Sequence, residues 1–75
     1  MKSIKLYVES ELDMFRNECN FTDEELQYFN MKAKDCSDNK ISIEMNISSS
    51  KVAKLSKQVR AKMKRVLELG VVVIQ

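Results

Sequence analysis

Three places in this 75-residue chain share one pattern, in which a hydroxyl residue stands between apolar residues at a fixed spacing. The hydroxyl residues are Thr22, Ser37 and Ser48, each with an apolar residue directly before it and another four residues after it. A hydroxyl at the N-cap accepts a hydrogen bond from a free N–H of the first turn, and the apolar pair forms a hydrophobic staple. The pattern therefore predicts helices over residues 22–34, 37–45 and 49–68.

The rest of the chain is also favourable to helix, because it contains no proline and only one glycine. Ser10, with Asp13 three residues later, predicts a first helix over 10–19. Residues 3–8 alternate between apolar and polar and predict a short strand, although a helix beginning near Ile4 also fits the spacing. The β-branched tail 71–75 predicts a second strand, paired with residues 3–8 or with the tail of a second copy.

These elements predict a mainly α fold, a small helix-turn-helix bundle of about four helices with room for short strands at 3–8 and 71–75. The length fits one domain, residues 1–75. We expect a helix-turn-helix core at 21–69, an N-terminal strand and helix extension at 1–20, and a strand-like tail at 70–75. Helical spacing predicts that the core is formed by Leu12, Phe15, Cys19, Leu26, Phe29, Ala33, Ile41, Met45, Val52, Leu55, Val59, Met63 and Val66.

Charge is concentrated in the last helix. Residues 51–65 contain seven Lys/Arg and no acid, whereas residues 1–50 contain six Lys/Arg against ten Asp/Glu. The apolar residues of this stretch recur three and four apart, which indicates that one face packs on the core. The opposite face then presents a local positive charge, which favours approach to a polyanion such as nucleic acid.

A short helix, a tight turn and a longer basic helix form a helix-turn-helix. Asn46 is the expected turn residue, because asparagine tolerates the left-handed conformation. Ser42 is the small residue expected where the two helices cross. Gly70 fits the position just after the last helix.

One set of residues within 21–63 carries a family resemblance: Phe21-Thr22, Glu25, Leu26, Ser37, Ile41, Met45, Ile47-Ser48, Val52, Val59 and Lys62-Met63. On these positions the chain resembles the DNA-binding domain of LuxR-type regulators and the related fourth region of bacterial sigma factors. Its beginning also resembles small sigma-like phage or prophage proteins of Gram-positive bacteria. The resemblance implies a transcription regulator that binds duplex DNA, with RNA polymerase as a further contact. The chain departs from the family pattern at Asp35 (usually Gly), Ser42 (usually Ala) and Lys51 (usually Thr).

The outward face of a recognition helix enters the major groove with its N-terminal half. At 100° per residue, the side chains expected at base edges are Ser49, Ser50, Ala53, Lys54 and Lys57. The two lysines are suited to guanine and the alanine to a thymine methyl group. The side chains expected to hold phosphates are Lys51, Arg60, Lys64 and Arg65. Gln58 is expected beside Lys51 on one flank of the outward face, as a further DNA-binding residue.

Other interpretations remain open. The same fold serves as a protein-interaction module, for example an adaptor that binds polymerase or a regulator without touching DNA. A basic face also arises as ordinary solvated surface or on helices that lie on membranes. The tail 71–75 and the end of the last helix suggest a homodimer.

Enzymatic activity is not expected, since no His, Gly-rich loop or environment that activates a nucleophile accompanies the carboxylates. No cofactor or metal is expected, because the chain has no His and two Cys. Cys19 and Cys36 at apolar positions fit free thiols in a reducing cytoplasm. No signal peptide or membrane span is indicated.

Overall fold

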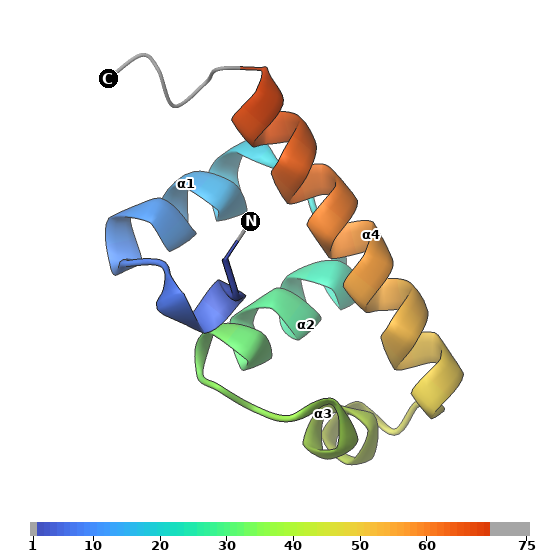
Figure 1. The fold of residues 1–75 in the computed structure, drawn as a ribbon. Coiled ribbons are helices and arrows are strands. Elements are labelled where there is room, and N and C mark those ends of the chain that lie inside the picture. Colours follow the sequence, from blue (N-terminus) through green and yellow to red (C-terminus); the bar gives the residue numbers. More distant parts are fainter. Residues whose placement is uncertain (1, 70–75) are drawn as a thin grey trace.

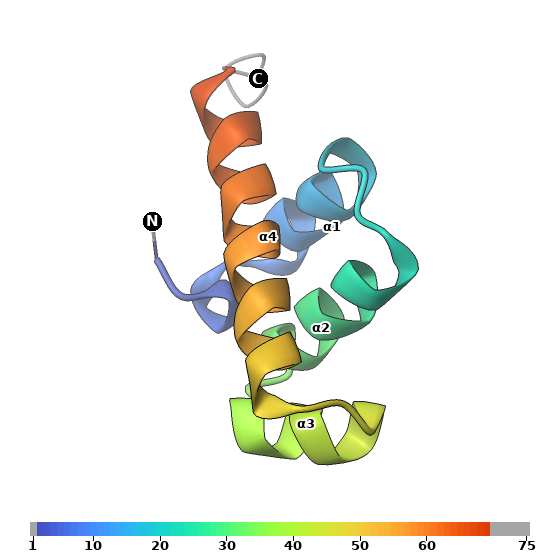
Figure 2. The ribbon, with the colours of Figure 1, turned by 90° about the vertical axis from the view of Figure 1, so that its right-hand side faces the viewer.

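The fold is a helical assembly, seen in a computed structural model that describes residues 2–69. A short 3-10 turn, η1 (Ile4–Leu6), precedes four α-helices in this part of the chain. They are α1 (Glu9–Glu18), α2 (Asp23–Ala33), α3 (Asp38–Met45) and α4 (Ser49–Glu68). Helix α4 runs along the molecule past α1 and α2, and α3 lies across its N-terminal end (Figures 1 and 2). This part of the structure contains no strand, and the mainly α prediction is confirmed.

The three hydroxyl caps are all present. Thr22 Oγ1 accepts from the N–H of Glu25 at 3.2 Å, while the Glu25 carboxylate accepts from the N–H of Thr22 at 3.0 Å. Ser37 Oγ accepts from Lys40 and Ser48 Oγ from Lys51, both at 3.1 Å. Each bond satisfies an N–H that the first turn of a helix leaves free. The predicted starts of α2, α3 and α4 are therefore confirmed to within one residue.

One hydrophobic core joins all the elements. Its buried members are Ile4, Leu12, Phe15, Cys19, Tyr28, Phe29, Ile41, Val52, Leu55, Val59, Met63 and Val66. Phe15 lies between two other rings, with its centroid 5.0 Å from that of Tyr7 and 6.2 Å from that of Phe29. All five predicted apolar residues of α4 are buried. Residues 1–20, predicted as an extension, thus contribute four side chains to the core that α4 closes.

The predicted strand at 3–8 is wrong. Ile4 is 2% exposed, but Leu6 and Val8 are each 59% exposed, so the alternation of apolar residues does not mark a buried face. The backbone bonds are local, from Leu6 N–H to Ser3 O at 2.9 Å and from Tyr7 N–H to Ile4 O at 3.2 Å. A strand needs a paired neighbour, whereas a single turn places Ile4 in the core without one. The second predicted strand, 71–75, and Gly70 lie outside the described residues.

The start of α1 also differs from the prediction. The N-cap is Val8 rather than Ser10, and the helix begins at Glu9. Valine has no side-chain acceptor, so only half of a capping box forms: the Glu11 carboxylate accepts from the N–H of Val8 at 3.0 Å. Extended backbone at Tyr7 and Val8 separates η1 from α1, which excludes the alternative of one helix from Ile4 onward.

Candidate nucleic-acid interface

The turn between α3 and α4 fixes the direction of α4. Asn46 has φ 56° and ψ 48°, the left-handed conformation that the sequence predicted. The N–H of Asn46 donates to Ile43 O at 3.2 Å and that of Ile47 to Ser42 O at 3.1 Å, which is the Schellman pattern of helix ends. The Ser42 hydroxyl donates to Ile47 O at 2.6 Å. Three hydrogen bonds thus close the turn, and the hydroxyl that an alanine would lack supplies one of them.

The start of α4 is open to solvent. Ser49, Ser50 and Ala53, three of the residues expected at base edges, are exposed. The first turn of α4 contains no acidic residue, whereas α1, α2 and α3 each have at least one there. A helix N-terminus carries partial positive charge and free N–H groups. The beginning of α4 is therefore electrostatically suited to an anion.

A strip of exposed side chains follows along the outward side of α4, which we call the outer face. It consists of Ser50, Lys54, Lys57, Ala61, Lys64 and Arg65. Lys54, Lys57 and Arg65 form no ion pair with any of residues 2–69, and the Lys64–Glu68 pair is long, at 3.9 Å. Small residues between the cations leave room for close approach of a surface. The structure thus places together five of the predicted residues: Ser50, Lys54, Lys57, Lys64 and Arg65.

Three other predicted residues lie on the flanks of α4 rather than on its outer face. Lys51 and Gln58 are half-buried on the side nearest the start of α2, and Lys51 Nζ lies 3.2 Å from Glu24 Oε1. Arg60 is half-buried on the opposite flank, and its Nε donates to Ser56 Oγ at 3.4 Å. The Lys51–Glu24 pair is largely exposed and is worth at most about 1 kcal/mol. Lys51 can therefore exchange its carboxylate partner for a phosphate at little cost.

Lys62 has a role that sequence reasoning did not find. Its Nζ donates to the carboxylate of Glu25, a residue only 4% exposed, and to Asn20 O at 3.1 Å. Burial alone would raise the pKa of Glu25, but the hydrogen bonds from Lys62 and Thr22 outweigh it and lower that pKa. This cation fastens α4 to the capping box of α2. The sequence holds one indication of this role: the helical position of Lys62 borders the apolar face of α4, next to Val59.

The remaining chemistry of the described residues is limited. Cys19 is buried and Cys36 half-buried, and both are free thiols. Within residues 2–69, no three His, Cys, Asp or Glu side chains are grouped as metal ligands. None of the helices in this part of the chain is both long and apolar enough to cross a membrane.

Comparison with known proteins does not assign a family. No protein-family model, curated protein or solved structure matches the chain. The choice of function therefore rests on the geometry of α3, the Asn46 turn and α4.

Proposed function

We propose that this protein binds duplex DNA and regulates transcription, with α4 as the recognition helix in the major groove. The observation that carries the proposal is the outer face of α4, on which four exposed cations lie together with two small residues, Ser50 and Ala61. The turn at Asn46 supports it, because α3 lies across the start of α4 as the first helix of a helix-turn-helix does (Figure 2). The N-terminal half of α4 then meets the bases, and the later cations meet the backbone.

The side chains of the outer face, together with the neighbouring Ala53, have distinct tasks in this proposal. Lys54 and Lys57 reach guanine N7 and O6, and Ala53 contacts a thymine methyl group. Ser50 hydrogen-bonds a donor or an acceptor at a base edge. Lys64 and Arg65, two to three turns further on, neutralise phosphates and set the register without reading sequence. Contact with RNA polymerase belongs to the same proposal, as does a cytoplasmic location.

The proposal predicts how strongly the affinity for DNA depends on salt concentration. Four cations on phosphates or at groove edges release about four counterions, so log K falls with log salt at a slope of about −3 to −4. Between 50 and 200 mM salt this amounts to a loss of about 100-fold in affinity. A solvated face that binds nothing has no such slope.

The test is fluorescence anisotropy with a pool of random duplexes at the two salt concentrations. Lys54→Ala/Lys57→Ala is expected to weaken binding at least tenfold and to reduce the slope by about 2. The matched control is Lys2→Ala/Lys34→Ala, which removes the same charge from exposed positions outside α4. Selection of tight binders from the pool then gives the target sequence.

Two outcomes would contradict the proposal. One is no binding at 50 mM salt. The other is an equal loss of affinity in the two double variants, which would indicate attraction by net charge alone. In either case the protein-interaction module becomes the better explanation of the outer face.

A further inference from the structure

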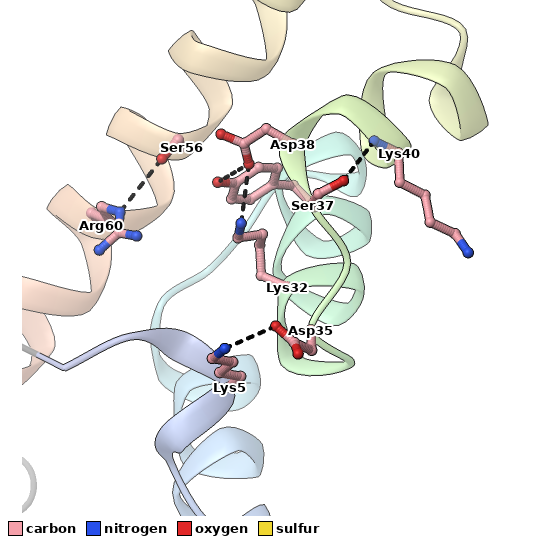
Figure 3. Close-up of polar contacts among 9 residues, drawn as sticks. Lys5, Lys32, Asp35, Ser37, Asp38, Lys40, Ser56 and Arg60 are labelled. Atoms are coloured by element: carbon pink, nitrogen blue, oxygen red, sulfur yellow. Dashed lines mark hydrogen bonds and ion pairs between the residues drawn. The ribbon is translucent and has the colours of Figure 1, made fainter.

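A second cationic site lies on the flank of α4, away from its outer face. A pocket of about 180 Å³ is lined there by Ser3, Ile4, Lys5, Lys32, Asp35 and Arg60. Three elements that are distant in sequence supply its cations: Lys5 comes from η1, Lys32 from α2 and Arg60 from α4 (Figure 3). The volume equals that of about six water molecules, which leaves room for one tetrahedral oxyanion and some of its hydration.

Arg60 is the least satisfied member of this pocket. Its Nε bonds Ser56 Oγ at 3.4 Å, and its two terminal nitrogens bond none of the described residues. The side chain is half-buried, so it has lost part of its hydration without gaining a carboxylate. A planar guanidinium with two free NH2 groups is suited to two oxygens of one phosphate group.

Lys32 is held in place by its neighbours. Its Nζ donates to Asp38 Oδ1 at 3.1 Å, and the hydroxyl of Tyr28 donates to the same oxygen at 3.4 Å. The Lys32 side chain is 24% exposed, which is low for a lysine. An ammonium has three donors, so two remain after the bond to Asp38. The pocket thus contains a second pre-oriented donor group.

The charge of the pocket remains positive after its acid is counted. Lys5 Nζ lies 3.1 Å from Asp35 Oδ1, and this pair is exposed to solvent. Three cations against the one carboxylate of the lining leave a surplus of two positive charges, one of which the neighbouring Asp38 offsets. A phosphate group would restore the balance that the protein leaves incomplete.

We propose that the pocket between η1, α2 and α4 binds a phosphate oxyanion, with Arg60 as the principal ligand and Lys32 as the second. A phosphodiester of bound nucleic acid and a free phosphate present the same oxygens to these donors. The site is separate from the outer face of α4, so it does not depend on the proposed function.

The probe is inorganic phosphate, added to the full chain at constant ionic strength and followed by backbone amide NMR shifts. We expect saturable shifts at Lys5, Lys32 and Arg60. Arg60→Gln is expected to weaken binding at least tenfold. Arg65→Gln makes the same charge change on the outer face and is expected to leave the affinity of the pocket for inorganic phosphate unchanged. Asp35 has a left-handed backbone, with φ 65°. Asp35→Asn keeps a residue that tolerates this conformation and removes the opposing charge, so phosphate binding should tighten about threefold.

Two results would contradict the proposed site. One is a set of NMR shifts that do not saturate with phosphate and are spread over every lysine. The other is an equal loss of phosphate affinity in Arg60→Gln and Arg65→Gln. Because Asp35→Asn is a gain of affinity, poor folding of the arginine variant cannot imitate the full result. Lys54→Ala/Lys57→Ala separates the two proposals, since it should weaken DNA binding at least tenfold and leave phosphate binding in the pocket intact. If Arg60→Gln also weakens DNA binding and phosphate competes with DNA, the occupant is a phosphodiester. If DNA binding is unaffected, the occupant is a free phosphate.

Discussion

Replacing Lys62 by methionine tests whether this lysine of α4 stabilises the fold. The change removes the ammonium that bonds Glu25 while keeping an unbranched apolar side chain of similar reach. Breaking a fully buried ion pair costs about 3–5 kcal/mol, because a charge is left without a partner. The Lys62 side chain is 27% exposed, so we expect a smaller loss, about 2–3 kcal/mol at pH 7. For a chain of this length the melting temperature should fall by about 10–20 °C.

The pH dependence separates this pair from general packing. In the native protein the pKa of Glu25 is lowered from 4.5, so its contribution to stability is present above that pH and is lost as the pH falls below it. Without Lys62, burial is opposed only by the Thr22 bonds, so the pKa of Glu25 should be higher in the variant than in the native protein. The stability difference between the two proteins should therefore decrease as the pH falls, to under about 1 kcal/mol near pH 3.

Urea denaturation at pH 7 and pH 3 measures both quantities. The control is Lys64→Met, two positions further on, whose one ion pair within residues 2–69 is exposed and 3.9 Å long. We expect it to change the free energy of unfolding by less than about 0.5 kcal/mol. A cost for Lys62→Met that is below 0.5 kcal/mol, or the same at both pH values, would refute the reasoning. The result also matters for DNA studies, since Lys62→Met should reduce binding only by unfolding the protein.

Three further changes test the turn, the thiols and the flank of α4. Asn46→Ala should lower the free energy of unfolding in urea by about 1 kcal/mol, because alanine disfavours the left-handed backbone. Asn46→Gly should leave it unchanged, and equal effects of the two variants would contradict the assigned turn. Burial raises the pKa of Cys19 from 9.0 to about 11. At pH 8, mass spectrometry should therefore show that iodoacetamide modifies Cys36 well before Cys19. Equal rates for the two thiols would argue against a closed core. Glu24→Gln should free Lys51 for phosphate and steepen the salt slope of DNA binding by up to about 1, and an unchanged slope would show that Lys51 takes no part.

The starts of α2, α3 and α4 were predictable because the forces that set them are local. A hydroxyl three residues from a free N–H, with flanking apolar residues, acts over a single turn. The buried face of α4 was predictable for the same reason, since five apolar side chains recur at helical spacing. The left-handed turn followed from the tolerance of asparagine for that conformation.

Features that depend on packing between distant segments were not predictable. The pattern at 3–8 resembles a strand, but the position of Ile4 is decided by the face of α2 that it meets. Ser10 looked like a better cap than Val8, yet the Glu11 carboxylate satisfies the earlier N–H instead. The partners of the basic residues were also hidden, because Lys62 finds a buried carboxylate 37 residues away. A charge count treats this lysine and Lys57 alike.

The division of α4 into two faces has a consequence for how the protein can vary. Its inward side chains are enclosed by the rest of the core, so substitutions there are penalised through folding. Its outward positions are exposed, and changes at Ser50, Ala53 or Lys57 should leave the melting temperature almost unchanged. Mutational tolerance along this one helix should therefore rise and fall every three to four residues. A new binding preference can arise at the tolerant positions without a compensating change in the scaffold.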